Sequence, residues 1–205
     1  ATWDEYLGRL SKTHRKKFRR LESRLLETGL VQWHVVRDAE EFDAAWDLFE
    51  QLHRQRWQSL GQRGCLGSPQ WQAFHREVAR QLLDEGRLRL AWLTYEGQPL
   101  AAEYQFVGDQ IVYAYQGGLA PELLKHHPGR LAHLCATRLS IEEGRKTLDL
   151  LSGDEPYKQH YRAQAQKTYR LQMAPPRRLA QWRHWACTSV VEAGRLAKRC
   201  VGLLS

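Results

Sequence analysis

The sequence predicts an α/β (α+β) fold in which a mixed, mostly antiparallel sheet is flanked by helices. Some stretches of the chain have apolar residues three and four positions apart, which is typical of helices. Between them lie stretches in which apolar and polar residues alternate one by one, which is typical of strands. Two tight turns, at 96–97 and 108–109, join three consecutive strand patterns into a meander. Hydrophobic residues make up 42% of the 205 residues, which is enough to build a core.

The N-terminal segment is predicted to form one basic helix over residues 3–28 that ends at Gly29. Residues 9–27 contain eight Lys or Arg and two Glu, a net charge of +6. Residues 175–205 carry another +5, so the rest of the chain is slightly acidic within the total of +8. A solvated face on a packing helix explains the N-terminal charge, and binding to nucleic acid or to an anionic surface is the alternative.

The first half of the body is expected to contain one strand, at residues 30–37, and two helices. Asp38 and Glu41 have the spacing of a capping box. The helix that they begin carries a stripe of apolar residues: Phe42, Ala45, Trp46, Phe49, Leu52 and Leu60. Ser68 and Pro69 start the second helix, whose expected buried stripe is Trp71, Phe74, Val78 and Leu82.

The second half is predicted to contain the three-stranded meander, a helix, a short buried strand, a helical stretch with Lys158, and a last strand. The expected strands and long helix cover 87–95, 98–107, 110–117, 128–144, 148–151 and 167–173. We therefore expect a basic linker helix at 1–29, a catalytic domain at 30–174, and a basic helical tail at 175–205.

Several classes of protein are disfavoured by composition. No run of apolar residues approaches the roughly 20 that span a bilayer, and the N-terminus has no apolar signal region. The four cysteines form no CxxC pair and no zinc-ligand spacing with histidine, so we expect reduced thiols, no metal and a cytoplasmic location. The chain begins at Ala1 rather than Met, which leaves an upstream segment open.

Five short segments, taken together in order, resemble the CelD-type (cellulose-biosynthesis-associated) acetyltransferases of the GNAT fold, which are related to the FemABX aminoacyl transferases. These segments are FEQLHRQRW at 49–57, AAEYQF at 101–106, YQGG at 115–118, HPGRLA at 127–132 and LDLLSGDEPYK at 148–158. The resemblance covers about residues 3–173. It implies transfer of an acetyl or other acyl group from acyl-CoA to an amine or hydroxyl by direct attack, and pairing of the domain with an upstream GNAT-like half through the helix at 1–29.

The resemblance also implies where an acyl-CoA donor binds. In the GNAT fold two parallel strands, here 110–117 and 147–151, splay apart around the donor, and its pyrophosphate lies on the first turn of the next helix, where backbone N–H groups are free. The donor-binding residues are then Tyr115, Gln116, Lys125, Gly129, Arg130 and Leu131. Most GNAT enzymes have Q/R-x-x-G-x-G/A at this point. The segment HHPGRLA has only one glycine, so aminoacyl-tRNA stays open as an alternative donor. It also stays open that Pro128 and Gly129 only start a helix and bind no phosphate.

Five residues are candidates for catalysis: His53, Glu103, Tyr115, Asp149 and Lys158. His53 is either a general base or a locally bonded helix-end histidine, and Glu103 is either a base in mid-strand or a solvent-facing carboxylate. Asp149 lies in an apolar run, so it either has a cationic partner, for which we suggest Lys158, or lines the cleft. Tyr115 either donates a proton to the leaving sulfur or belongs to the core.

The acceptor is expected to bind between the loop at 61–68 and the segment at 152–162. Cationic side chains on that side favour an anionic acceptor, a small molecule or a polysaccharide precursor: Arg63, Lys158, His160 and Arg162. Two other functions stay open at this point. One is an aminoacyl transferase fed by charged tRNA, which would use the basic helix, and the other is a non-catalytic GNAT-like scaffold.

Overall fold

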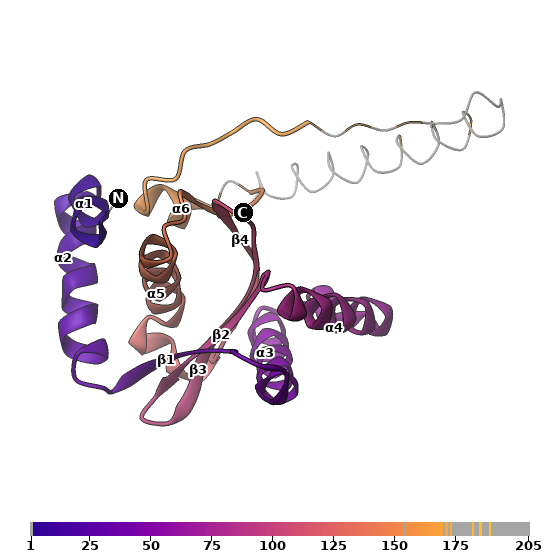
Figure 1. The fold of residues 1–205 in the computed structure, drawn as a ribbon, viewed down its shortest axis with the longest axis horizontal. Helices are drawn as coiled ribbons and strands as arrows, with labels where there is room; N and C mark the ends of the chain where they lie inside the picture. Colours follow the sequence, from indigo (N-terminus) through magenta and orange to yellow (C-terminus); the bar gives the residue numbers. More distant parts are fainter. Residues whose placement is uncertain are drawn as a thin grey trace. The chain divides into compact units, whose positions relative to one another are not determined.

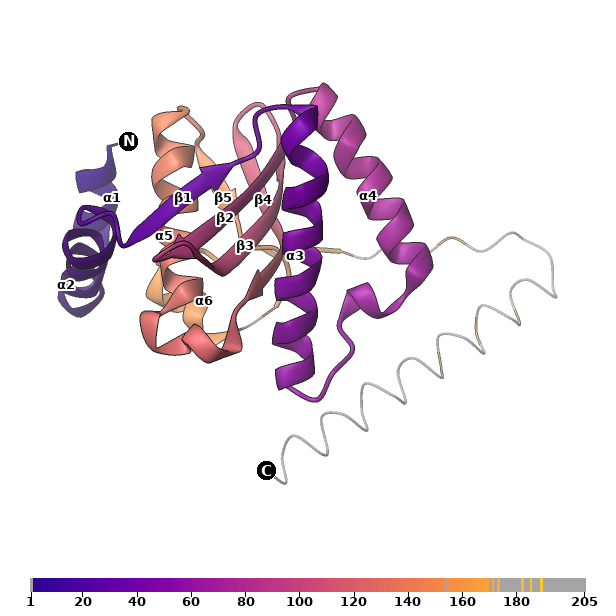
Figure 2. The same ribbon diagram turned by 90° about the horizontal axis from the view of Figure 1, so that it is seen from below.

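The computed structural model describes residues 2–153 and 155–169, together with Leu171, Met173, Trp182, Trp185 and Ser189. The chain divides into two compact units, residues 1–163 and residues 164–205. The first unit contains the sheet and the helices that surround it (Figures 1 and 2). Most of the predicted tail at 175–205 lies outside the described residues.

Five strands form one sheet in the order β1-β2-β3-β4-β5. Their bounds are Val31–Val35, Leu88–Tyr95, Gln98–Val107, Ile111–Leu119 and Thr147–Asp149. The first four strands pair antiparallel, whereas β4 and β5 pair parallel. The predicted mixed, mostly antiparallel sheet is therefore confirmed. At the β2–β3 turn, Glu96 and Gly97 both have positive φ, as a two-residue hairpin requires.

The predicted last strand at 167–173 is wrong for the residues that the structure describes. Residues 167–169, Leu171 and Met173 adopt no strand. The side chains of Leu171 and Met173 are 91% and 96% exposed. A strand needs a neighbour that takes up its backbone hydrogen bonds, and alternation of side chains in the sequence cannot supply one.

One face of the sheet is covered by α3 (Ala39–Ser59) and α4 (Pro69–Asp84), as Figure 2 shows. Asp38 caps α3 through the backbone N–H groups of Glu40 and Glu41. The Glu41 carboxylate accepts from the N–H of Arg37, so the predicted capping box is displaced by one residue. The predicted α3 stripe is buried except for Leu60, which lies just after the helix and is 48% exposed.

The buried stripe of α4 differs from the prediction. Phe74 is 62% exposed, whereas His75 and Ala79 are buried against the sheet. The stripe through Trp71, His75 and Ala79 has the same helical spacing as the predicted one, and the sequence pattern favoured the larger apolar side chain at position 74. The structure instead buries the imidazole of His75, because the hydroxyl groups of Tyr104 and Tyr115 on the sheet form hydrogen bonds with it.

The other face is covered by α1 (Trp3–Arg9), α2 (Lys12–Leu21) and α5 (Pro128–Glu142), as Figure 1 shows. A single helix over 3–28 is therefore wrong. Leu10 and Ser11 are extended, and the Ser11 hydroxyl accepts the N–H of His14 and starts α2. A serine side chain competes with the helix for backbone groups and so favours a new N-cap. A π-helical turn, η1 (Glu22–Leu26), follows α2.

The two faces have separate apolar cores. The N-terminal helices bury Leu7, Leu10, Phe18 and Leu21 together with residues of β1, β2, β3 and α5. The core beneath α3 and α4 is dominated by aromatic side chains, among them Trp46 and Tyr104. None of the helices in the described part of the chain is both long and apolar enough to cross a membrane.

Candidate active site

An opening in the sheet lies between β4 and β5. The two strands pair over only three positions, from Ile111 with Thr147 to Tyr113 with Asp149. The strand β5 then ends, while β4 continues to Leu119, paired with β3 on its other side. Within the described residues, the backbone of β4 from position 114 onward therefore has no strand neighbour on the β5 side. This is the place where the predicted donor strands were expected to separate.

Glu103 lies beside this opening, on the α5 face of the sheet. It pairs in β3 with Gly117 of β4, which is exposed and has no side chain to cover the carboxylate. A Cβ added to Gly117 would lie 3.7 Å from Glu103 Oε1. Burial raises the pKa of Glu103 to about 7, and Gln105 Nε2, which donates to Glu103 Oε2 at 3.4 Å, lowers it only in part. A carboxyl group with this pKa can gain or lose a proton near neutral pH.

The loop after β5 forms the rim of the opening. Asp149 Oδ1 accepts the backbone N–H of Leu151 at 2.7 Å. Lys158 Nζ, from α6 (Pro156–His160), donates to the carbonyl oxygens of Leu151, Ser152 and Gly153 at 3.1–3.2 Å. The suggested ion pair between Asp149 and Lys158 is therefore wrong. Lys158 pairs instead with its helical neighbour, since its ammonium lies 2.8 Å from a carboxylate oxygen of Glu155.

The first turn of α5 carries three of the predicted donor-binding residues, Gly129, Arg130 and Leu131. The backbone N–H groups of Arg130 and Leu131 already donate to the carbonyl oxygen of His127. Gly129 is exposed, and a Cβ there would meet only Leu119 Cδ2, at 3.8 Å. Neither packing nor backbone conformation therefore requires this glycine. The side chain of Leu131 is fully buried, whereas Lys125, in the short helix η3 (Pro121–His126), is exposed.

His53 lies on the opposite face of the sheet and is fully buried. Its Nε2 accepts the indole N–H of Trp57 at 2.8 Å, and Gln116 Oε1 and Cys65 Sγ lie 3.3 Å and 3.4 Å from the same nitrogen. Burial lowers the pKa of His53. The backbone of α3 passes so close to β4 here that a Cβ on Gly118 would clash with the backbone of His53. This imidazole therefore has no exposed atom with which to meet a substrate.

Tyr115 belongs to a hydrogen-bonded cluster with His75 and Tyr104 that was not predicted from the sequence. Its hydroxyl lies 3.3 Å from His75 Nε2, and His75 Nδ1 lies 3.4 Å from the hydroxyl of Tyr104. The imidazole thus bridges two tyrosines, with Trp71 packed over it at 3.8 Å between ring centroids. The spacing of Trp71 and His75 on one helical turn was the only feature of the sequence that could have indicated this cluster.

The structure thus separates the predicted catalytic residues. Glu103 lies on the α5 face, where it is among the charges that act on Tyr157 of α6. His53 and Tyr115 lie on the α3 face, and Asp149 and Lys158 form the rim between them. Among the residues that the structure describes, no group of three or more His, Cys, Asp or Glu side chains is arranged to hold a metal ion.

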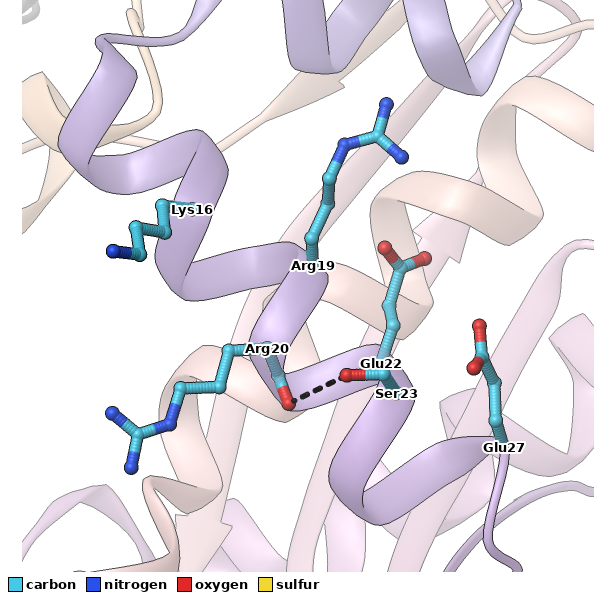
Figure 3. A pocket seen from close by; sticks show the side chains of 6 residues that line it. All are labelled: Lys16, Arg19, Arg20, Glu22, Ser23 and Glu27. Carbon is cyan, nitrogen blue, oxygen red and sulfur yellow. Dashed lines mark hydrogen bonds between the residues drawn. The ribbon is translucent and has the colours of Figure 1, made fainter.

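A separate hollow of about 440 Å³ lies on the outer surface of α2 and η1 (Figure 3). Its lining comes from one continuous stretch of helix and mixes cations with carboxylates: Lys16, Arg19, Arg20, Glu22, Ser23 and Glu27. Because α2, η1 and the adjoining Glu27 alone line this hollow, and the sheet opening is formed by other elements, the hollow does not belong to the candidate active site.

A family model described as an acetyltransferase (GNAT) domain matches residues 12–159 of the chain. The matched region includes the whole sheet, the opening between β4 and β5, and α5. No curated protein is detectably similar to the sequence.

Two solved structures illustrate the similarity of fold. One is an aminoglycoside acetyltransferase from an uncultured soil metagenomic sample, in complex with trehalose, with a TM-score of 0.51 and 10% identity over 72% of this chain and 98% of that chain. The other is FemX, with a TM-score of 0.58 and 12% identity over 75% of this chain and 51% of that chain. The present chain therefore spans about half the length of FemX, and at these identities both structures show the fold alone.

Proposed function

Because the chain belongs to the acetyltransferase (GNAT) domain family, we propose that it transfers an acyl group from acyl-CoA, bound at the opening between β4 and β5, to an amine or hydroxyl of a small acceptor. In this reaction the acceptor nitrogen or oxygen attacks the thioester carbonyl. The new bond to the acyl carbon forms, the C–S bond breaks, and the thiolate leaves. The acceptor loses a proton, which a general base must take.

The single observation that carries the proposal is the position of Glu103. Its carboxyl group lies on β3, beside the exposed Gly117 of β4, in the part of β4 that no longer pairs with β5. Its pKa of about 7 leaves a large fraction ionised at neutral pH, and it is still basic enough to accept a proton from an attacking group. We assign Glu103 as the general base.

The donor is assigned to the open edge of β4 and the start of α5. On the side that β5 does not cover, the backbone of β4 around Tyr115 and Gln116 can hydrogen-bond an extended chain in the way that a sheet edge accepts another strand. Exposed Gly129 leaves space for phosphates, and Arg130 and Lys125 supply positive charge. Leu131 then contributes packing below the turn rather than a direct contact, because its side chain is buried and its N–H is used.

The remaining candidates are assigned supporting roles. Lys158 and Asp149 hold the loop at 151–153 in place at the rim of the opening. His53 and Tyr115 help to position α3 and α4 on the sheet, His53 through its buried contact with Gln116 of β4 and Tyr115 through its hydrogen bond with His75. In this proposal these four side chains hold the surrounding elements in position, and Glu103 acts on the acceptor.

We extend this proposal to the type of acetyltransferase, its acceptor and its domain boundaries. The five CelD-like segments favour a CelD-type acetyltransferase related to FemABX, acting in the cytoplasm on an anionic or sugar-linked acceptor, with boundaries at 30–174 for the catalytic domain. The cations of the predicted acceptor side, Arg63 and Arg162 among them, support an anionic group on that acceptor. Residues 1–29 would then join the domain to an upstream GNAT-like half, and 175–205 would form its tail.

Thermal unfolding in the presence of donors tests the proposal directly. Acetyl-CoA and longer acyl-CoAs should raise the melting temperature in a concentration-dependent way, because a ligand that binds only the folded state stabilises it by mass action. A donor that stabilises the protein is then paired with a panel of amines and hydroxyl compounds, and release of free thiol is followed. If no donor shifts the melting temperature at millimolar concentration, acyl-CoA is not the substrate, and salt-dependent tRNA binding becomes the next measurement.

A further inference from the structure

Basic side chains from three separate elements converge beside the start of α5. His14 of α2 and His160 of α6 stack, with ring centroids 4.4 Å apart and an interplanar angle of 24°. Lys17 lies one helical turn after His14 and so shares its face of α2. Arg130, in the first turn of α5, lies beside Tyr161 next to His160. Segments that are more than a hundred residues apart in the sequence thus meet through their cationic groups.

No carboxylate of the described chain balances this cluster. The pKa of His14 is lowered first by burial and then by His160, Lys17 and Arg130. The pKa of the neighbouring His127 is lowered first by burial and then by Arg130, followed by Lys17, Arg20 and His126. Every charged group that acts on these two imidazoles is basic. Such an arrangement is unfavourable in isolation and becomes favourable when an anion binds among the cations.

Several other arginines of the described chain form salt bridges with carboxylates. Arg76 and Arg80 share the carboxylate of Asp43, and the buried Arg89 pairs with Glu143 at 2.6 Å. Even on α2, Arg19 pairs with Asp4 at 2.9 Å. These pairs join elements of the fold, whereas none of the salt bridges among the described residues involves His14, Lys17, Arg130 or His160.

Ser11 occupies one of the two nitrogens of the His14 imidazole. Ser11 Oγ accepts the backbone N–H of His14 and lies 2.8 Å from its Nδ1. When the serine hydroxyl donates a hydrogen bond to Nδ1, the neutral ring carries its proton on Nε2, which is the nitrogen left for a ligand. Protonation of the ring strengthens this donor further, so an anion is the ligand that suits it.

We propose that His14, Lys17 and His160, together with Arg130, form a binding site for a phosphate group. An arginine can bind phosphate through two parallel hydrogen bonds, and lysine and histidine add point charges and single donors around it. The proposal rests on the proposed function only through Arg130, which also belongs to the donor site. The phosphate can come from two sources, the 3′-phosphate at the nucleotide end of CoA or a phosphate ester on the acceptor.

The test compares the wild-type protein with the double variant His14→Ala/Lys17→Ala, in isothermal titrations with CoA and with dephospho-CoA, which lacks the 3′-phosphate. If the site holds that phosphate, the wild type should bind CoA at least about tenfold more tightly than dephospho-CoA, a difference of about 1.4 kcal/mol. The double variant should bind the two equally, with its affinity for dephospho-CoA unchanged. Lys16→Ala, which removes a cation from the same helix but is not among the groups acting on His14 or His127, is the matched control and should behave as wild type.

A second series uses inorganic pyrophosphate and thermal unfolding. If CoA and dephospho-CoA bind equally but pyrophosphate stabilises the wild type and not the double variant, the site holds a phosphate from the acceptor. If no form of CoA binds while the pyrophosphate effect still depends on His14 and Lys17, the proposed donor fails and the phosphate site stands. If the wild type and the double variant respond alike to every ligand, the phosphate site is refuted, whatever the fate of the donor assignment.

Discussion

The two faces of the sheet are built from the same strands but differ in chemical character around Glu103 and Tyr104. On the α3 and α4 face, buried polar side chains lie among aromatic rings, and most of their polar atoms have partners there: His75 bonds to Tyr104, and His53 Nε2 accepts from Trp57. On the α5 face, Glu103 lies beside an exposed glycine and keeps some exposure of its own. Neighbouring residues of β3, Glu103 and Tyr104, therefore face different environments because successive strand residues point to opposite sides.

This difference distinguishes polar groups that stabilise the fold from a carboxyl group that can act on a substrate. Polar groups that satisfy one another inside a packed core contribute to stability and have no capacity left for a substrate. A carboxyl group that is partly desolvated, weakly bonded and accessible has an altered pKa and an open side, which are the properties of a general base. Substitutions on the two faces should therefore have different consequences, in stability on one and in turnover on the other.

The largest effect is expected for Glu103→Gln, which keeps the shape of the side chain but removes the base. Turnover should fall by about 10²- to 10⁴-fold, the usual contribution of general base catalysis. Wild-type turnover should rise with pH and level off above about 7, the pKa of Glu103, and the variant should lack this limb. Steady-state rates from pH 5 to 9 provide the measurement, and unchanged turnover would remove Glu103 from the mechanism.

The same variant has a signature in stability. Burial raises the pKa of Glu103 from 4.5 in the unfolded chain to about 7, so it is the neutral carboxyl group that favours folding. That contribution is fully present below pH 4.5 and is lost as the pH rises through about 7. The wild type should therefore lose up to about 3 kcal/mol of unfolding free energy relative to the variant between pH 4.5 and 8. Urea unfolding at the two pH values measures the difference.

On the opposite face, Gly118→Ala should cost about 2 kcal/mol or more of unfolding free energy, because the new methyl group meets the backbone of His53 in α3. Gly129→Ala is the matched control, since its Cβ would make only an ordinary contact with Leu119. Its unfolding free energy should stay within about 0.5 kcal/mol of the wild type. Equal stability of the two variants in chemical denaturation would mean that α3 does not press on β4 as described.

At the rim between the faces, Lys158→Met keeps the length of the side chain but removes the donor to three carbonyl groups. We expect turnover to fall about tenfold, because a displaced loop costs positioning, with a loss of stability of about 1 kcal/mol. Lys146→Met removes an exposed lysine just before β5 and serves as the control. Full turnover of Lys158→Met, measured beside this control, would show that the loop at 151–153 has no part in the reaction.

The smallest effect on turnover is expected for His75→Phe. The variant leaves the hydroxyl of buried Tyr104 without its partner, which should cost about 1 to 3 kcal/mol of stability. Turnover should stay within about threefold of the wild type, since His75 acts from the face away from Glu103. Tyr115→Phe provides the comparison, because it removes one hydroxyl and leaves the imidazole. A large loss of turnover in either variant at full stability would move the proton chemistry to the α3 face.

Much of the fold was predictable because local patterns determine it. The turn at 96–97, the cap at Asp38 and the proline at position 69 each specify a boundary through local backbone chemistry, and the structure has these boundaries. The alternation of β3 also placed Glu103 on the face away from Tyr104. The errors arose where two local choices had similar energies, such as Ser11 within a basic helix, and where a strand depended on a distant neighbour, as at 167–173.

The sequence by itself determined which residue types were available, the order of the elements, and the alternation that gives each strand two chemically different faces. Only the tertiary structure decided which of those residues meet. Burial set the pKa of Glu103, the early end of β5 exposed the edge of β4, and packing placed His75 between two tyrosines and Lys158 on three carbonyl groups. Local periodicity is a property of neighbouring residues, whereas desolvation and contacts between distant segments depend on how the whole chain packs.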